Sequence, residues 1–533
     1  MSTIAIDFGT SNTVVTHWDN LAQRPEVLHF PELSHTLGNN PTLIPSLVYV
    51  LEAERGEIVA GQAVRDRGLD ITTDSRFFRG FKRGIGAKIQ GFLPELDGVN
   101  ITFEQVGQWF LATILNQFPP DLLTSADPPE LILTVPVDSF EAYRYWLLEI
   151  CQALPMAQIR LLDEPTAAAL GYGLGKEQLV LVVDFGGGTL DLSLVQLAGT
   201  PEQKPVGFIL KWGNQKVGDN SPQKIKTAKV LAKVGQNLGG TDLDDWLMEH
   251  FRQQQGIPAT PLTMRLVEKL KIQLSSTSEA TEVYFNEQTF DSYELHLDRA
   301  QFQEILTQHD FFGQLDTAMT QLLQQARRQG VTPAEIESVL LVGGTTQIPA
   351  VQDWIRGYFS PEQIKSDQPF TAIAQGALQL GQGLEVQDFL YHSYGIRYWN
   401  RRQNCHGWHP LIKTGQPYPM TTAVPLILGA SVENQPSIEL IIGELGSEDQ
   451  GTEVYFEGDR LITKNTGGTA AIKILNDRPG ARTIARLDPL GSPGSDRVKI
   501  EFQVDKQCSL RITVRDLLTG EILVRDHPVV QLS

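Results

Sequence analysis

Two stretches of this sequence share one pattern and decide the fold: Ile4–Val15 reads IAIDFGTSNTVV, and Val180–Leu194 reads VLVVDFGGGTLDLSL. Each has an apolar run, then Asp-Phe-Gly, then a turn of small or hydroxylated residues, and finally a second apolar run. Apolar runs bounded by turn residues predict β-strands. Asp7 and Asp184 occupy matching positions in the two copies. The repeat therefore predicts two lobes of one duplicated architecture.

Around these copies, the first two-thirds of the chain alternates short apolar runs with segments of helical period, which is typical of an α/β fold. Further strands are expected at Leu131–Val135 and Ser338–Val342. Helices are expected at Thr102–Phe118, which begins with a capping box, at Leu262–Leu274 and at Pro333–Glu337.

From about residue 393 the pattern changes to short strands separated by turns, which predicts an all-β module. The expected strands are Ser437–Ile442, Glu453–Phe456, Lys499–Val504, Ser509–Val514 and Glu521–Val524. We therefore expect an α/β domain over residues 1–384, a linker over 385–392 and the β module over 393–533.

Composition limits the class of protein. The chain has 533 residues, a formal net charge of −19, 41% hydrophobic residues and 20% charged residues, which is ordinary for a globular protein. The acidic balance argues against nucleic-acid binding, and no apolar run is long enough to span a membrane. Three scattered cysteines and the lack of a signal-peptide pattern predict a cytoplasmic location.

The two repeated turns have the chemistry of a phosphate site. Glycines let backbone N–H groups approach a phosphate closely, and hydroxyl and amide side chains add donors. These residues are Gly9, Thr10, Ser11 and Asn12 in the first copy and Gly186, Gly187, Gly188 and Thr189 in the second. Asp7 and Asp184 provide carboxylates for a hydrated Mg²⁺, which needs few protein ligands. One such turn alone is compatible with an ordinary hairpin, but two matched copies favour a polyphosphate clamp.

Six segments carry a resemblance to a known family. They are IAIDFGTSNT (4–13), LLDEPTAAALGYG (161–173), VVDFGGGTLDLSL (182–194), NLGGTDLDDWL (237–247), EKLKIQLS (268–275) and LLVGGTTQIPAVQ (340–352). Together they resemble the seventy-kilodalton heat-shock chaperones of the actin-like ATPase superfamily. VQDFL (386–390) resembles the interdomain linker of that family, and the β module resembles its peptide-binding β-sandwich. The helical lid of the family has no counterpart, so a lidless member is expected.

The resemblance implies a fold and a set of roles. The fold is a two-lobed actin-like ATPase domain, a duplicated ribonuclease H-like α/β architecture, followed by an all-β sandwich. Glu164 would position the attacking water, Thr189 and the turn residues would bind phosphates, and Asp7, Asp184 and Asp191 would hold Mg²⁺ or K⁺. The residues implied to meet the rest of ATP or ADP are Gly239, Gly240, Glu268, Lys271, Ser275, Gly343, Gly344 and Thr345.

The resemblance also implies a switch and a peptide groove. Pro165, Arg144 and Asp388 would relay the nucleotide state to the linker. The groove positions are Ile396, Trp399, Leu428, Ser431 and Ile438, which suit an extended hydrophobic peptide. The alternative is that Ile396, Leu428 and Ile438 are plain sandwich core.

Some positions depart from the family pattern. Arg65, in Gly61-Gln-Ala-Val-Arg65, stands where the catalytic lysine of the family is expected, with Arg67 as the substitute, so ATP turnover is predicted to be slow. Ile272, Gln347 and Phe370 replace polar groups expected at the nucleoside and leave adenine specificity open. Seven lysines over residues 204–233 indicate an insertion, either a solvated face or a partner-binding hairpin.

These observations predict an ATP-dependent chaperone with slow ATPase activity. The implied partners are unfolded or extended hydrophobic polypeptides, a J-domain co-chaperone and a nucleotide-exchange factor. One alternative is a nucleotide-sensing adaptor that hydrolyses little ATP and docks a dedicated protein partner. Another is a filament-forming or small-molecule kinase member of the superfamily, which the linker and the appended sandwich disfavour.

Overall fold

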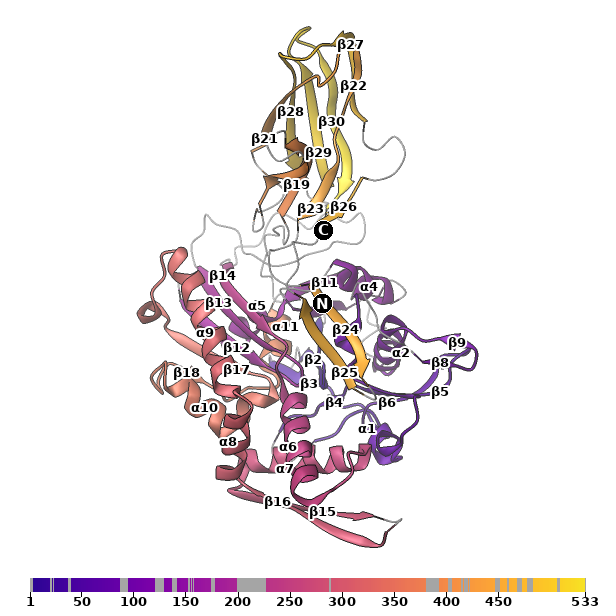
Figure 1. Cartoon of the computed structure of the whole chain (residues 1–533), viewed down its shortest axis with the longest axis vertical. Helices are drawn as coiled ribbons and strands as arrows, with labels where there is room; N and C mark the ends of the chain where they lie inside the picture. The colour runs from indigo at the N-terminus through magenta and orange to yellow at the C-terminus, as the bar shows by residue number, and fades with distance from the viewer. Residues whose placement is uncertain are drawn as a thin grey trace. The chain divides into compact units, whose positions relative to one another are not determined.

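A computed structural model gives the structure of the chain (Figure 1). It describes residues 3–532 except 20–21, 23, 37–39, 87–93, 120–128, 137–140, 152–153, 155, 157, 174–177, 199–226, 287–288, 380–392, 401–404, 414–415, 417–419, 421, 446–450, 458–459, 467–471, 477–482 and 506–508. The chain divides into two compact units, Met1–Val386 with Val454–Lys464, and Gln387–Glu453 with Asn465–Ser533. The predicted linker, 385–392, lies outside the described residues, so its bounds stay a prediction.

The first sheet of the N-terminal unit has the strand order β11-β10-β1-β2-β3, and β4 also pairs with β2. Its strands are β1 (Thr3–Phe8), β2 (Asn12–Asp19), β3 (Arg24–Val27), β4 (Ile44–Pro45), β10 (Glu130–Val135) and β11 (Gln158–Asp163). β1 runs antiparallel to β2 and parallel to β10.

The second sheet has the strand order β14-β13-β12-β17-β18. Its strands are β12 (Leu179–Phe185), β13 (Leu190–Ala198), β14 (Thr227–Gln236), β17 (Ser338–Val342) and β18 (Ile364–Lys365). β12 runs antiparallel to β13 and parallel to β17, as β1 does with β2 and β10. The matching topology confirms the duplication that the sequence predicts.

The helices α5 (Glu164–Gly171) and α11 (Ala372–Leu378) pack between these two sheets. One core cluster joins Ala5 and Ile132 of the first sheet to Val182 and Leu340 of the second through the alanines of α5. Small side chains let backbones approach closely, so this part of the sequence is rich in alanine. The shared core sets the spacing between the ends of β1 and β12.

Further helices and small sheets complete this unit. The helices are α1 (Gln62–Asp66), α2 (Phe103–Asn116), α4 (Glu141–Cys151), α6 (Gly240–Gln255), α7 (Pro261–Ser276), α8 (Arg299–Gln308), α9 (Phe311–Arg328) and α10 (Pro349–Arg356). The short 3₁₀ helices are η1 (Leu69–Ile71), η2 (Phe81–Gly84), η3 (Pro333–Glu335) and η4 (Gly344–Gln347). The remaining strands are β5 (Leu47–Glu52), β6 (Glu57–Ala60), β7 (Phe77–Arg79), β8 (Glu95–Leu96), β9 (Val99–Asn100), β15 (Glu279–Asn286) and β16 (Asp291–Asp298).

Two of the three predicted helices are confirmed. α2 begins with the expected capping box, in which Gln105 N donates to Thr102 Oγ1 at 3.2 Å and Thr102 N donates to Gln105 Oε1 at 2.9 Å. α7 covers the predicted Leu262–Leu274. The predicted helix Pro333–Glu337 is wrong: it is the single 3₁₀ turn η3, because the chain turns extended at Ile336 and enters β17 at Ser338.

The C-terminal unit is all-β, as expected. Its sheets have the orders β20-β19-β23-β26, β21-β28-β29-β30 and β22-β27. The strands are β19 (Ser393–Asn400), β20 (Cys405–Ile412), β21 (Val424–Gly429), β22 (Gln435–Glu439), β23 (Ile442–Leu445), β26 (Ile472–Ile474), β27 (Thr483–Gly491), β28 (Asp496–Val504), β29 (Ser509–Asp516) and β30 (Ile522–Gln531). The strands β24 (Gly451–Glu457) and β25 (Arg460–Thr466) pair with each other, and most of this hairpin, Val454–Lys464, belongs to the first unit.

One predicted strand of this unit, Ser437–Ile442, is divided in the structure. β22 ends at Glu439 and β23 begins at Ile442, where the chain changes its pairing partner from β27 to β19. The buried Asn476 side chain accepts from Ile442 N at 2.8 Å and donates to Leu440 O at 2.9 Å. These bonds satisfy the backbone at the break, because buried backbone groups need partners.

Across the part of the chain that the structure describes, every helix is too short or too polar to cross a bilayer.

Candidate functional site

The two repeated turns face each other. A Cβ atom at Gly187 would lie 1.8 Å from Ser11 Oγ, so any larger residue would push the two turns apart. Ser46 braces the first turn, because its hydroxyl donates to Gly9 O at 2.8 Å and its N–H donates to Ser11 O at 2.9 Å. The clamp-like arrangement expected from the repeat is therefore present in the structure.

Two further glycine segments contact the second turn. Gly240 N donates to Gly186 O at 3.1 Å, and Thr345 Oγ1 donates to the same carbonyl at 2.8 Å. Lys271 Nζ donates to Gly240 O at 2.7 Å. The turns at 186–189, 239–240 and 343–345 thus form one surface of backbone and small side chains, which suits close contact with a phosphorylated ligand.

Carboxyl groups lie near the ends of the strands beside these turns; Glu164 is buried, whereas Asp7, Asp184 and Asp191 are half-buried. Thr134 Oγ1 donates to Asp7 Oδ1 at 2.8 Å. Burial, together with the charge of Glu164, raises the pKa of Asp7 to about 6 and raises the pKa of Asp184 well above its ordinary value. Burial likewise raises the pKa of Asp191 to about 6. Such crowding of acids favours binding of a cation among them.

Lys82, in η2, places a positive charge among these carboxyl groups. Its Nζ atom lies 3.1 Å from Glu164 Oε1 and 5.7 Å from the centre of the Phe8 ring. Burial alone would lower the pKa of Lys82, but the neighbouring Glu164 raises it above its ordinary value. The ammonium is therefore charged at every physiological pH.

The expectation that Arg65 supplies this cation is wrong. Arg65 Nη2 lies 3.1 Å from both carboxylate oxygens of Glu268 on α7, and Lys82 stands among the carboxylates instead. The proposed substitute, Arg67, pairs with exposed Glu32 at 3.7 Å. The signal missed in the sequence is the Lys-Arg pair of the segment Phe81–Gly84, which no spacing rule connects to Glu164.

The predicted nucleoside side chains lie along α7. Lys271 Nζ is 2.7 Å from Asp244 Oδ1, and burial raises the pKa of Asp244 to about 7. Ser275 follows one turn after Lys271, and its carbonyl accepts from Arg299 at 3.3 Å. The ring of Phe370 lies against Gly344, where an added Cβ would be 3.2 Å from the ring edge.

The two expected switch residues that the structure describes lie in different helices, Pro165 in α5 and Arg144 in α4. Glu164 and Pro165 begin the helix, and Asp163 Oδ1 caps it by accepting from Thr166 N at 2.8 Å. Arg144 is buried in α4, and its charge lowers the pKa of Asp163 against the larger raising effect of burial. The third residue, Asp388, lies outside the described residues.

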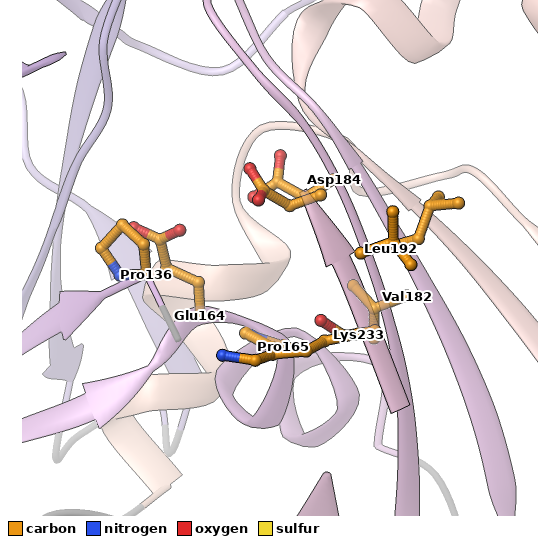
Figure 2. Close-up of a pocket in the computed structure, with 10 residues that line it drawn as sticks. Pro136, Glu164, Pro165, Val182, Asp184, Leu192 and Lys233 are labelled. Carbon is orange, nitrogen blue, oxygen red and sulfur yellow. The ribbon is translucent and has the colours of Figure 1, made fainter. Parts of the chain in front are cut away.

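A pocket adjoins the carboxylates (Figure 2). In that view Glu164 and Asp184 lie on opposite sides of it, and the side chain of Lys233 extends toward Pro165. Its lining consists of Pro136, Glu164, Pro165, Val182, Asp184, Asp191, Leu192, Ser193, Lys233 and Val234. Burial lowers the pKa of Lys233 to about 8. Lys233, the last lysine of the predicted insertion, is therefore not part of a solvated face; residues 199–226 lie outside the described part of the chain.

In the β unit, two of the predicted groove positions are core. Ile396 and Ile438 are 4% and 3% exposed and belong to the main core cluster, and Leu428 packs against it. The groove prediction is wrong for Ile396 and Ile438, and the plain-core alternative holds there, because both side chains point between the sheets. Ser431 is exposed and donates through its N–H and its hydroxyl to Gln435 Oε1; the side chain of Trp399 lies outside the described residues.

The residues of the site fit a nucleotide with a divalent cation. Among the described residues, no three His, Cys, Asp or Glu side chains form a ready-made metal-binding group. Mg²⁺, however, keeps several waters and binds through one or two carboxylates plus phosphate oxygens. Asp7 and Asp184 are half-buried acids with raised pKa values, and a bound cation would favour their ionised forms.

Two sheets of matching topology, with facing glycine turns and a cluster of carboxyl groups beside them, define the class of two-lobed, actin-like ATPase domains, here followed by a β-sandwich. The comparison with known families then narrows this class. The model of the Hsp70 protein family matches residues 3–202 and 227–392. The chain belongs to the Hsp70 family, whose members are in general ATPases that act as chaperones.

Proposed function

We propose that this chain is an ATP-dependent molecular chaperone that binds and hydrolyses ATP to control its grip on extended hydrophobic peptides. The observation that carries the proposal is the Lys82–Glu164 pair at 3.1 Å, which lies among half-buried carboxyl groups beside two facing glycine turns. Family membership supports the same assignment. Arg65 gives no reason to expect slow turnover, because Lys82 supplies a lysine beside Glu164.

Hydrolysis of ATP depends on positioning and on neutralising charge rather than on covalent catalysis by the protein. The turn N–H groups and the hydroxyls of Thr10 and Thr189 would hold the phosphates. Glu164 would orient a water molecule, and Lys82 would neutralise charge that develops on the terminal phosphate. Bound Mg²⁺ would add a second positive charge there, with Asp7 and Asp184 holding its waters.

The β unit offers apolar surface to a peptide. Ile427, Val432 and Leu490 are 50%, 59% and 50% exposed. Ile427 lies on β21, at the edge of its sheet, and an edge strand offers unpaired backbone groups to an extended peptide. We place the peptide site at these exposed residues rather than at Ile396 and Ile438. A J-domain co-chaperone and a nucleotide-exchange factor remain the expected partners.

The test is the dissociation rate of a fluorescent hydrophobic peptide from the full chain, first with ADP and then after addition of Mg·ATP. We expect ATP to raise the rate by about 5- to 150-fold, which corresponds to ordinary allosteric coupling energies. E164A should remove ATP hydrolysis, and R144A should remove the ATP effect on peptide release. Peptide release that ignores ATP would contradict coupling.

The adaptor alternative makes a different prediction for the same variant. An adaptor needs nucleotide binding but no hydrolysis, so E164A would leave its partner binding unchanged. Because Lys82 and Glu164 form an intact charged pair in the site, the structure favours the hydrolysing chaperone over the adaptor.

A further inference from the structure

Arg83 directly follows Lys82 in η2 but contacts the other half of the site. A Cβ atom at Gly188 would lie 2.3 Å from Arg83 Nε and 2.6 Å from Arg83 Nη2. The guanidinium therefore packs on the backbone of the β12–β13 turn, and only glycine leaves room for it. The helix η2 therefore places Lys82 beside Glu164 and Arg83 beside the β12–β13 turn at 186–189.

The guanidinium has an edge with no partner. Arg83 Nε and Nη2 are both buried and make no hydrogen bond to any described residue. These two nitrogens lie on the same edge of the guanidinium, and this edge forms two parallel hydrogen bonds with a carboxylate or a phosphate. Buried polar groups are nearly always hydrogen-bonded, so two orphaned donors on one edge need an explanation.

A buried arginine elsewhere in the chain shows what this edge does when it has a purely structural role. Arg497 Nε and Nη2 both donate to Asp516 Oδ2, at 3.2 and 2.8 Å. The acids within electrostatic range of Arg83 are Asp242 and Asp191. Asp242 Oδ2 instead accepts from Gly239 N at 2.7 Å, and Asp191 is hydrogen-bonded by Thr189. The Arg83 edge is therefore left for a ligand with paired acceptor oxygens.

We infer that Arg83 binds the terminal phosphate of the nucleotide through its Nε–Nη2 edge, on the side opposite Lys82. The inference rests on the proposed function, because it takes ATP as the ligand. Among the phosphates of ATP we assign the terminal one to Arg83 for two reasons. Arg83 is next to Lys82, which contacts Glu164, and it packs on the turn that leads to Asp191. Arg83 belongs to the segment before α2 and the turn belongs to the second sheet, so a bound terminal phosphate would link the two halves of the unit.

The experiment compares ATP and ADP binding by calorimetry, in the presence of Mg²⁺, for the wild-type chain and for R83Q, R83K and R356Q. Arg356 is an exposed arginine on α10 that pairs with Asp353, so R356Q is the matched control. We expect R83Q to weaken ATP binding by about 10- to 100-fold and ADP binding by less than about threefold, as loss of a charge-assisted bidentate contact predicts. R83K keeps the charge but lacks the planar edge, so it should recover only part of the loss.

Three results would overturn the inference: unchanged ATP affinity in R83Q, equal loss for ATP and ADP, or full recovery in R83K. Thermal unfolding without ligand checks that R83Q folds; if it does not, R83K alone carries the test, and an affinity equal to wild type overturns the proposal.

Inorganic tripolyphosphate separates this inference from the proposed function. A wild-type chain that binds no ATP, but whose unfolding temperature rises with tripolyphosphate in an Arg83-dependent manner, would refute the ATPase and retain the phosphate role of Arg83. A chain that binds ATP equally well with and without the Arg83 side chain would refute the phosphate role of Arg83 and leave the proposed ATP binding intact.

Discussion

At the scale of single residues, basic side chains that look equivalent in the sequence have different partners in the structure. Arg65 and Lys82 both precede α2, and either would satisfy a requirement for a cation near phosphate. The structure places Arg65 on Glu268 and Lys82 on Glu164, both at 3.1 Å. Glu164 adjoins Asp7 and Asp184, whereas Glu268 lies on α7, so Lys82 rather than Arg65 lies beside these carboxyl groups.

Substitution of Lys82 and of Arg65 should show which of the two residues takes part in ATP hydrolysis. We expect K82A to lower the rate of single-turnover ATP hydrolysis by about 100-fold or more, the usual effect of removing one group that stabilises transition-state charge. R65A should change this rate by less than about threefold. Rapid-quench measurement with Mg·ATP tests both variants, and a loss in R65A as large as that in K82A would restore Arg65 to the site.

Lys233 predicts a pH dependence of stability. Its pKa is lowered to about 8 in the folded state from an ordinary value of 10.5, so the folded state disfavours the charged form. The unfolded chain binds more protons between these two values, and the contribution of Lys233 to stability therefore rises from pH 8 to pH 10.5 and is constant below pH 8.

Methionine at this position should remove the effect. We expect the stability of the wild-type chain relative to K233M to increase by up to roughly 3 kcal/mol between pH 7.5 and pH 10.5, from the size of the pKa shift. Urea unfolding at several pH values measures this difference. A difference that is the same at all these pH values would mean that the Lys233 ammonium is not desolvated.

At the scale of elements, two ion pairs connect α7 to the α1–η1 segment. Arg65 pairs with Glu268 at 3.1 Å, and Arg265 Nη1 pairs with Asp70 at 3.1 Å. α7 follows the glycines of α6, whereas α1 and η1 precede η2 with its two cations. These pairs therefore span the site from one half of the unit to the other, and their rupture would open it.

Breaking both pairs should speed nucleotide release. Arg65 and Glu268 are both partly exposed, so solvent screening limits their pair to about 0.2–1 kcal/mol. Arg265 is partly exposed as well, although its partner Asp70 is buried. We expect the double variant R65Q/R265Q to release a fluorescent ADP analogue about 2- to 30-fold faster in stopped-flow experiments. K269Q is the control, because Lys269 on the same helix pairs with Glu282 of β15 at 2.8 Å, away from α1. Equal acceleration by K269Q would point to general loosening of α7.

At the scale of the whole molecule, the chain consists of two units with separate cores. The core of the C-terminal unit includes a buried ion pair: Arg497 and Asp516 are 5% and 0% exposed, and Asp516 also accepts from Leu518 N at 2.8 Å. Removing one partner of a buried pair leaves the other charge unpaired in the interior.

D516A should therefore destabilise only one unit. We expect a loss of about 3–5 kcal/mol in the unfolding transition of the β unit, with the transition of the ATPase unit unchanged. Calorimetry of the full chain with and without Mg·ATP identifies the ATPase transition, because ligand raises it. D526N is the matched control, since Asp526 is mostly exposed and its pair with Arg511 should contribute less than about 1 kcal/mol. A single shared transition that shifts as a whole would contradict independent units.

The sequence by itself determined the features that depend on local pattern. Apolar runs with turn residues located the strands, the repeat of Asp-Phe-Gly predicted two matching lobes, and the Thr102–Gln105 capping box marked the start of α2. The resemblance carried by whole motifs predicted the family. These signals lie within short segments, so they can be read without knowing which segments meet in space.

Only the tertiary structure decided which distant residues share a site. Lys82 meets Glu164, Arg83 meets Gly188, and Lys233 enters the pocket beside Asp184, although none of these pairs is close in the chain. Ile396 and Ile438 likewise looked suited to a groove but face the core, because an apolar side chain on a strand fits either role until the facing sheet is known. Charge and hydrophobicity are properties of a residue, whereas its partner depends on how the sheets and helices pack.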